Sequence, residues 1–381
     1  MAAAGPTTET GPVSEQARIA SLDLTRGIAV LGILLMNAVS FRFVEAAYYN
    51  LSAAGSETWL DWAVGIFGEV FVDQKFMGMF SLLFGAGVML FIDRAAQRGR
   101  PAVLLHLWRS VLLLAMGIAH FQLWYGDVLW IYAVSAFILI ALRKLPDKAL
   151  LTLGVAVFML SVTSDLYAQA LANAGAPLGG TWHPTEVEDF TIGYLSWASY
   201  IVRGPGMVLI GAALFRMGFM AGGKPAQTYR ITAILGLGIG LPLAALGVVI
   251  TALGDFANDV ALISQVPNNL GTIPASLGYV SLIILWSNGA ENWLKRRLRA
   301  VGRMALTNYL TQSILGVLVL TILLGDVDFV NRSAVVVFVF AVWALQMWWS
   351  HAWLSRYQFG PVEWLWRTAT YRSVQPLRRP N

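Results

Sequence analysis

Long apolar runs separated by short polar segments recur along almost the whole chain. A helix needs about 20 mostly apolar residues to cross a bilayer. Stretches near this length lie at 22–41, 76–92, 103–122, 126–142, 149–168, 204–221, 231–252, 273–290, 304–324 and 333–350. The pattern predicts an all-α fold: a polytopic integral membrane bundle of about ten transmembrane helices over residues 21–350. A polar tail (1–20) precedes the bundle, and a basic and aromatic segment (351–381) follows it.

Residues 59–74 form a shorter apolar run of a different kind. It contains Asp61, Glu69 and Asp73 together with two tryptophans. Charged and aromatic residues side by side are typical of a helix that lies in the membrane interface. We therefore expect an interfacial helix at 59–74.

The composition excludes a soluble protein. Only 12% of the residues are charged and 57% are hydrophobic, whereas soluble domains carry about 25% charged residues. Lipid is therefore the expected partner of the surface, and the net charge of +5 does not indicate nucleic acid. The chain has no cysteine and four scattered histidines, so we expect neither disulfides nor a metal site. Residues 1–17 lack a basic region, so no cleavable signal peptide is expected.

Basic residues indicate the orientation, because Lys and Arg accumulate in cytoplasmic loops. With ten spans and a cytoplasmic N-terminus, most basic residues fall inside. The outer side keeps Arg42, Lys75, Arg203 and Arg332. Counting 59–74 as a span would place most later basic loops outside. We therefore expect both termini in the cytoplasm and leave a homo-oligomer open.

Three ionisable residues lie within the stretch 103–122. His106, Arg109 and His120 fall within about 60° of one another on a helix, and Gly117 lies on the same stripe. Such residues usually face a bundle interior or a watery cavity. One interpretation is a polar path in which Arg109 binds an anion and His120 transfers protons. The alternative is that the histidines are interfacial and Arg109 extends to lipid phosphate.

Asp127 follows His120 across a short external turn. Its carboxylate could accept the Nδ1 proton of His120 and orient the imidazole. It could equally cap the next helix, where a negative charge is favoured. The two roles are compatible.

Further polar residues lie at or within predicted spans. Arg26 follows Asp23 by three residues, which suits a local ion pair or a phosphate contact. Asn37, Asn308 and Gln312 would by default hydrogen-bond neighbouring helices. Amide groups such as those of Asn308 and Gln312 can also stabilise an oxyanion.

Five ordered segments carry a resemblance to a known family. They are RIASLDLTRGIAVLGILLMN (18–37), KFMGMFSLLFGAG (75–87), HFQLWYGDVLWIYA (120–133), GRMALTNYLTQS (302–313) and FGPVEWLWRTATY (359–371). With these segments the chain resembles the YeiB-like family (domain of unknown function 418) along nearly its whole length. The resemblance implies a protein of the bacterial cytoplasmic (inner) membrane.

More remotely, the chain is similar to polytopic acyltransferases of the heparan-glucosaminide N-acetyltransferase and acyltransferase type 3 kinds. The resemblance implies transfer of an acyl group from cytoplasmic acyl-CoA, as donor substrate, to an acceptor at the far membrane face. Asp23, Arg26 and Gly27 match the opening of the first helix. Asn37 stands where the type 3 enzymes place a histidine, so His120 is the expected base.

Two functions follow from these observations, beside a third, structural interpretation as a lipid-embedded scaffold or sensor in which Asp127 and the histidines are merely packed. In a membrane acyltransferase, Arg26, His106 and Arg109 would hold acyl-CoA, and His120 with Asp127 would activate the acceptor. In a transporter, the same polar path would relay protons without covalent chemistry.

Overall fold

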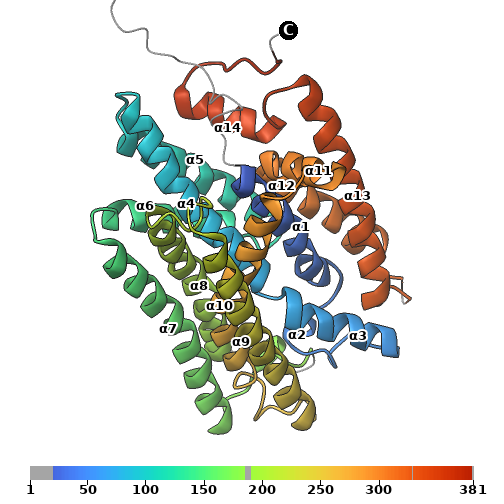
Figure 1. Ribbon diagram of the computed structural model, residues 1–381. Coiled ribbons are helices and arrows are strands. Elements are labelled where there is room, and N and C mark those ends of the chain that lie inside the picture. Colours follow the sequence, from blue (N-terminus) through green and yellow to red (C-terminus); the bar gives the residue numbers. More distant parts are fainter. Residues whose placement is uncertain (1–19, 185–189, 328, 380–381) are drawn as a thin grey trace, which may run out of the picture.

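The computed structural model describes residues 20–184, 190–327 and 329–379, and throughout this part of the chain the regular elements are helices (Figure 1). Near the C-terminus, a single β-bridge joins Tyr357 and Arg378. The first half contains α1 (Ala20–Arg42), α2 (Ala46–Tyr49), α3 (Trp59–Phe67), η2 (Gly68–Val72), α4 (Lys75–Gln97), α5 (Ala102–Phe121), α6 (Leu129–Leu142), α7 (Asp147–Asn173) and η3 (Gly179–Thr181). The second half contains α8 (Phe190–Arg216), α9 (Ala226–Leu253), α10 (Gln265–Ser287), α11 (Trp293–Arg303), α12 (Ala305–Gly316), η4 (Val317–Leu323), α13 (Arg332–Arg356) and α14 (Pro361–Tyr371).

The predicted all-α polytopic bundle is confirmed. Within the described ranges, nine helical stretches are long and apolar enough to cross a membrane. The further apolar helix α6 has 14 residues and spans only about 21 Å, less than the hydrocarbon core of a bilayer. Together they correspond to the ten predicted stretches.

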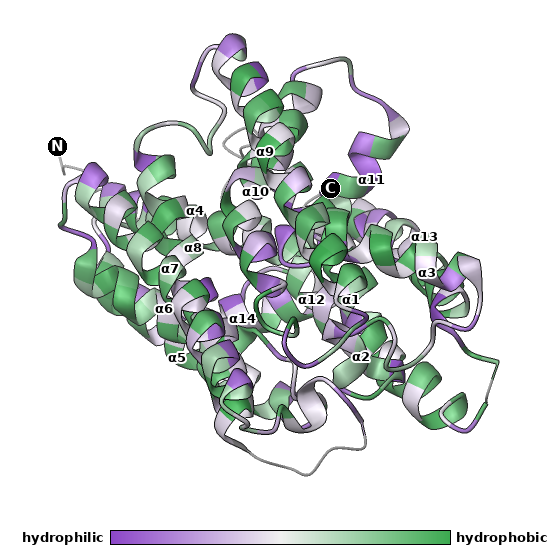
Figure 2. Ribbon diagram, turned by 90° about the horizontal axis from the view of Figure 1, so that it is seen from below, coloured by the Kyte–Doolittle hydropathy of each residue, from purple (hydrophilic) through white to green (hydrophobic). Residues whose placement is uncertain are grey.

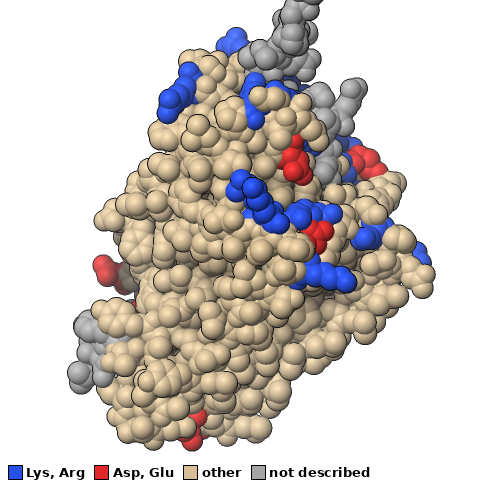
Figure 3. Space-filling view, turned by 90° about the vertical axis from the view of Figure 1, so that its left-hand side faces the viewer, with Lys and Arg blue, Asp and Glu red and all other residues tan. Residues whose placement is uncertain are grey.

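The outer surface of the bundle is apolar, as lipid requires. Leu253 of α9 is 84% exposed and Val337 of α13 is 69% exposed. Figure 2 shows hydrophobic residues along the outward side of peripheral helices such as α7. On the face that Figure 3 shows, Lys and Arg gather over the upper half of the molecule. The chain is an integral, multi-pass membrane protein, and we call its upper end in Figure 1, where α11 and α14 lie, the basic end.

The helix expected at 59–74 is divided. A capping box between Thr58 and Asp61 starts α3, and the chain continues through the π-helical turn η2. It then turns at Gln74, whose φ is +60°, into α4. Figure 1 shows α3 crossing the lower end of α13 rather than following the bundle, the orientation expected of an interfacial helix.

Two helices begin well before their predicted starts. α8 starts at Phe190 instead of 204, and α10 starts at Gln265 instead of 273. The first parts of α8 and α10, before residues 204 and 273, contain polar residues that lower the mean hydropathy. The structure buries these residues against one another: Asn269 of α10 donates to Asp165 of α7. Arg203 of α8 lies 3.8 Å from the same carboxylate.

Glycines allow the closest helix crossings. A Cβ at Gly27 of α1 would overlap the backbone oxygen of Leu298, and a Cβ at Gly302 would overlap that of Asp23. α1 and α11 therefore meet backbone to backbone, directly beside Arg26. Gly236 and Gly240 of α9 likewise face the backbone of α10, the packing typical of small residues four apart in membrane helices.

We predict that Gly27→Ala destabilises the bundle by about 1–3 kcal/mol, because backbone atoms cannot move aside as flexible side chains do. Thermal unfolding in detergent measures this loss. Gly238→Ala is the matched control, since a Cβ there meets nothing within 4 Å. An equal effect of both substitutions would contradict the proposed crossing.

Candidate functional site

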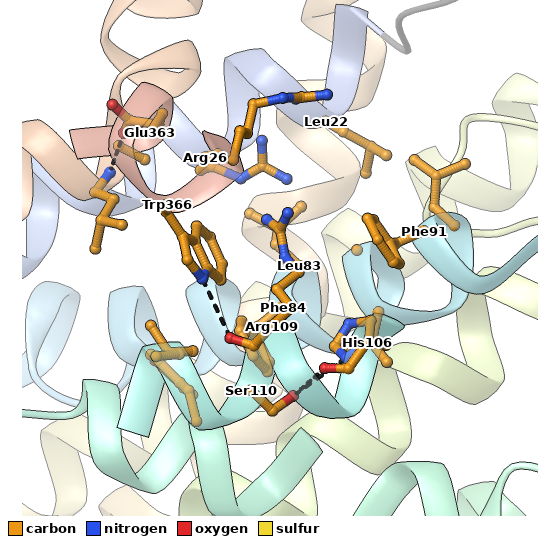
Figure 4. Close-up of a pocket in the computed structure, with 18 of the residues that line it drawn as sticks. Leu22, Arg26, Leu83, Phe84, Phe91, His106, Arg109, Ser110, Glu363 and Trp366 are labelled. Atoms are coloured by element: carbon orange, nitrogen blue, oxygen red, sulfur yellow. Dashed lines mark hydrogen bonds between the residues drawn. The ribbon is translucent and has the colours of Figure 1, made fainter. Parts of the chain in front are cut away.

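A cavity of about 350 Å³ opens at the basic end of the bundle, within the size range of small-molecule sites. It lies between α1, α4, α5, α12 and α14 (Figure 4). Its charged lining residues are Asp23, Arg26, Arg94, Arg98, Arg100, Arg109, Arg303, Glu363 and Arg367. Its apolar part includes Phe80, Leu83, Phe84, Val88, Leu113, Leu129 and Tyr132. We call it the arginine cavity.

The two acids of the arginine cavity are already engaged. Asp23 pairs with Arg26 at 3.2 Å on α1. Glu363 of α14 accepts hydrogen bonds from the backbone amides of Leu306 (2.7 Å) and Thr307 (3.0 Å), and so caps the N-terminus of α12. Burial raises the pKa of Glu363, although these hydrogen bonds oppose the shift. The remaining arginines leave the cavity with an excess of positive charge.

Arg109 of α5 lines the arginine cavity and is held there by aromatic rings. Its guanidinium stacks 3.6 Å from the ring centroid of Trp366 and 5.1 Å from that of Phe91. Figure 4 shows Arg109 and Arg26 directed into the same space. Among the described residues, no hydrogen bond or ion pair engages the Arg109 guanidinium. An arginine held flat by an aromatic ring, with its donors unused, suits a phosphate or carboxylate.

Helix α14 positions Arg109. The indole nitrogen of Trp366 donates to the backbone oxygen of Arg109 (3.1 Å), and that of Trp108 donates to Ala369 (3.0 Å). These reciprocal bonds fix α14 against α5, while Glu363 fixes it to α12. The α14 segment therefore forms part of the cavity wall.

The buried side of α5 carries both predicted histidines. His106, Ser110, Leu113, Gly117 and His120 follow one another along it, and all are buried. His106 lines the arginine cavity, with Nδ1 3.2 Å from the Ser110 hydroxyl. The sequence interpretation that both histidines face the bundle is confirmed. Arg109 lies at the edge of this stripe.

A second cluster surrounds His120. Its Nδ1 lies 2.7 Å from Oδ1 of Asp127, so the predicted pairing is confirmed. The hydroxyl of Tyr309 on α12 donates to the same oxygen (3.2 Å) and accepts from the amide of Val128 (3.3 Å). All three side chains are buried. In the neutral tautomer that donates from Nδ1 to Asp127, the Nε2 atom of His120 is an acceptor.

Asp127 also caps a helix, so both readings of the sequence hold together. Its Oδ2 accepts from the amides of Leu129 (3.0 Å) and Trp130 (3.4 Å) at the start of α6. Gly117 allows this arrangement, because a Cβ there would overlap the backbone of Trp130.

The Nε2 atom of His120 is buried and has no hydrogen-bond partner among the described residues. The rings of Tyr309 and Trp124 lie 5.4 Å and 6.5 Å from the imidazole. A neutral imidazole whose other nitrogen donates to a carboxylate is the arrangement of a general base.

The arginine cavity and the His120 cluster adjoin each other. His120 lies seven residues beyond Leu113 of the cavity, or about 10 Å along α5. Cavities approach the segment 126–129 from two sides. Leu129 lines the arginine cavity, Val128 lines a cavity of about 40 Å³, and Gly126 lines one of about 70 Å³.

Three predicted binding residues lie elsewhere. Asn37 lines the two smaller cavities rather than the arginine cavity. Asn308 donates to the backbone of Val301 (3.1 Å) and to Ser350 (3.0 Å). Gln312 donates to the backbone of Val30 (3.2 Å) and to Gln346 (2.9 Å). The amide donors of Asn308 and Gln312 are thus engaged in contacts between helices.

Sequence reasoning missed several residues of these sites. Tyr309 reaches Asp127 from a helix far along the chain, and a lone tyrosine in an apolar run gives no signal. Trp366, Arg367 and Glu363 belong to an aromatic and basic segment that reads as a membrane-surface belt. Its alternation of Trp, Arg and Glu is the signal that could have indicated a cavity wall.

Comparison with known proteins places the chain among relatives of similar length. A family described as "Protein of unknown function (DUF418)" matches residues 214–373. The chain is 31% identical to the uncharacterized protein YeiB of Escherichia coli (strain K12), over 94% of this chain and 98% of that protein. It is 29% identical to the uncharacterized protein YxaH of Bacillus subtilis (strain 168), over 97% and 98%. No solved structure matches the chain significantly.

We predict that Asp127→Ala lowers stability by about 2–4 kcal/mol, because α6 loses its cap and two buried donors lose their acceptor. Thermal unfolding in detergent measures this loss. Asp326→Ala removes an exposed acid and should leave the unfolding temperature unchanged. If Asp127→Ala were equally silent, the hydrogen bonds around Asp127 would not stabilise the fold.

Proposed function

The chain belongs to the DUF418 (YeiB-like) family of integral membrane proteins, and from this premise we propose that it transfers an acyl group across the membrane. The donor is acyl-CoA, bound from the cytoplasm, and the acceptor is a hydroxyl or amine compound at the opposite face. One observation carries the proposal: an arginine-lined cavity with an apolar interior adjoins a buried His–Asp pair.

The arginine cavity suits the two ends of an acyl-CoA. Arg109 and Arg26 supply bidentate donors for phosphate, and His106 lies beside them. The apolar residues deeper in the cavity accept the pantetheine arm and the acyl group. In this proposal the arm passes between Leu113 and Leu129 and brings the thioester to His120. Asp23, Arg26 and Gly27 match the start of the first helix in the remotely similar acyltransferases. This match favours acyl-CoA binding at the basic end.

The reaction balances with His120 as the proton carrier. Nε2 accepts the proton of the acceptor hydroxyl or amine as its oxygen or nitrogen bonds to the thioester carbon. Asp127 accepts a hydrogen bond from Nδ1 throughout, without taking the proton, and so stabilises the imidazolium. Collapse of the tetrahedral intermediate breaks the carbon–sulfur bond, and His120 returns its proton to the CoA thiolate. No further reactant is needed.

A transporter is the second candidate, and a specific feature favours it. Leu129 lines the arginine cavity, while Val128 and Gly126 line the two smaller cavities. Cavities that meet consecutive residues beside a His–Asp pair are an arrangement that alternating access with proton coupling can use. Consumption of acyl-CoA distinguishes the two functions, because transport leaves the thioester intact.

Our first functional prediction concerns binding. Acyl-CoA at 100 times its dissociation constant should stabilise the protein by about 2.7 kcal/mol, seen as a higher unfolding temperature. Arg109→Met retains the packing against Trp366 but removes the charge, and it should abolish the shift. Arg296→Met, on an exposed part of α11, is the control. Stabilisation that survives in Arg109→Met would place the ligand elsewhere.

The second functional prediction concerns the turnover of acyl-CoA. Membrane vesicles that contain the protein, supplied with acyl-CoA and an amine or hydroxyl acceptor such as ethanolamine, should release CoA faster than vesicles of the same host without it. The chain has no cysteine, so a thiol reagent detects CoA without background from the protein. His120→Gln can still hydrogen-bond Asp127 but cannot act as a base, and it should slow release by about 10²–10⁴-fold.

The control for this experiment is His183→Gln. His183 lies on the outer loop, where it contacts Asn258 (2.9 Å), and its substitution should leave the rate unchanged. Full activity in His120→Gln would rule out the proposed base. Stabilisation by acyl-CoA without any CoA release would favour the transporter.

A further inference from the structure

A second binding region lies at the end of the bundle opposite the arginine cavity. A cavity of about 70 Å³ opens there, with room for roughly five water molecules. Its lining residues are Asn37, Ser40, Glu45, Tyr48, Tyr49, Trp124, Tyr125, Gly126, Ser196, Trp197 and Tyr200. The adjoining cavity of about 40 Å³ shares Asn37, Tyr48, Tyr49 and Tyr200 with it. We call the larger one the aromatic cavity.

Aromatic rings form most of its wall. Trp197 lies between Tyr125 and Tyr200, with ring centroids 6.3 Å and 5.9 Å away and both contacts edge to face. Tyr48 and Tyr49 make a further edge-to-face pair at 5.1 Å. Tyr125 remains 39% exposed, which leaves the cavity open on its side. Several ring faces around a small space are the arrangement that binds organic cations.

Glu45 supplies the charge of this cavity. It precedes α2 and makes no side-chain cap for that helix. Among the described residues no hydrogen bond or ion pair engages its carboxylate. Burial raises the pKa of Glu45, as expected for a carboxylate without a counter-ion. Along the described lining, Glu45 is the ionisable acid, and neither lysine nor arginine accompanies it.

Two arginines of neighbouring segments make contacts outside the aromatic cavity. Arg42 donates to the backbone oxygens of Gly325 (3.0 Å) and Val327 (3.0 Å). Arg203 lines the adjoining cavity, donates to Ser199 (2.7 Å) and lies near Asp165. The hydroxyl of Ser196, on the cavity wall, is buried and has no hydrogen-bond partner among the described residues. The aromatic cavity therefore offers one carboxylate, a free hydroxyl and several ring faces.

We propose that the aromatic cavity is a binding site for an organic ammonium group, which pairs with Glu45 and packs against Trp197 and Tyr125. Cation–π attraction contributes to binding over the rings, and the carboxylate supplies the counter-charge. A neutral ligand of the same shape would leave that charge uncompensated. The aromatic cavity is thus proposed to bind a cation, whereas the arginine cavity is proposed to bind an anion.

Its position gives the site a relation to His120. Trp124 lines the aromatic cavity on one side and lies edge to face with the imidazole on the other, at 6.5 Å. If the ammonium compound is the acyl acceptor, the proposal rests on the acyltransferase function proposed above. Binding of an ammonium compound by the aromatic cavity does not depend on that function.

Binding is tested on the purified full chain in detergent, without acyl-CoA. The probes are choline, ethanolamine and 3,3-dimethylbutan-1-ol, the uncharged isostere of choline. At least one ammonium compound should raise the unfolding temperature and change tryptophan fluorescence in a saturable manner, while the alcohol has no effect. Glu45→Gln should weaken that binding at least tenfold. Since the Glu45 carboxylate makes no hydrogen bond, this variant should fold normally.

Two further variants locate the site. Trp197→Leu should weaken ammonium binding as well, whereas Asp259→Asn, an exposed acid outside the cavity, should leave it unchanged. Equal binding of the alcohol, no binding of either ammonium compound, or full binding in Glu45→Gln would each overturn the proposal. Ammonium binding without CoA release in the turnover assay would sink the acyltransferase function and leave this site standing. CoA release without ammonium binding would do the reverse.

Discussion

Asp127 joins three helices through hydrogen bonds to its two oxygens. It accepts from His120 on α5, from the first amides of α6 and from Tyr309 on α12. A buried carboxylate is costly unless its lone pairs are occupied, so the three helices are held at one fixed arrangement around it. That arrangement orients His120 and starts α6 deep in the bundle.

The remaining polar residues of the bundle fall into two groups by the same criterion. Some satisfy one another: Asn268 donates to Asp73 (2.8 Å) and accepts from Lys75, and Asn308 donates to Val301 and Ser350. Others keep unused capacity, among them the Arg109 guanidinium, the Nε2 atom of His120 and the Ser196 hydroxyl. In a medium without water, unused hydrogen-bonding capacity costs free energy. Residues that retain it are therefore the better candidates for binding and chemistry.

This distinction explains which features of the fold and of the sites could be predicted from the sequence. Hydropathy leads to the helical bundle, because it depends on single residues and their period. The His120–Asp127 pair was within reach because a short hairpin brings both residues together. Tyr309 and the α14 wall were not, since they depend on helices that meet only in the fold. The early starts of α8 and α10 were missed for the same reason: Asp165, Asn269 and Arg203 look unsuited to a membrane until they are paired.

The two ends of the bundle differ in charge preference, and this difference bears on direction. One cavity presents arginines and two acids that are already engaged, and the other presents a carboxylate with no basic residue along its described lining. With the ligands proposed above, an anion suits the first cavity and a cation suits the second. His120 lies between them, behind Leu129 on one side and Trp124 on the other. Such a polarity allows two different ligands to approach one reactive group from opposite faces while neither crosses, an arrangement that suits group transfer better than passage of a single solute.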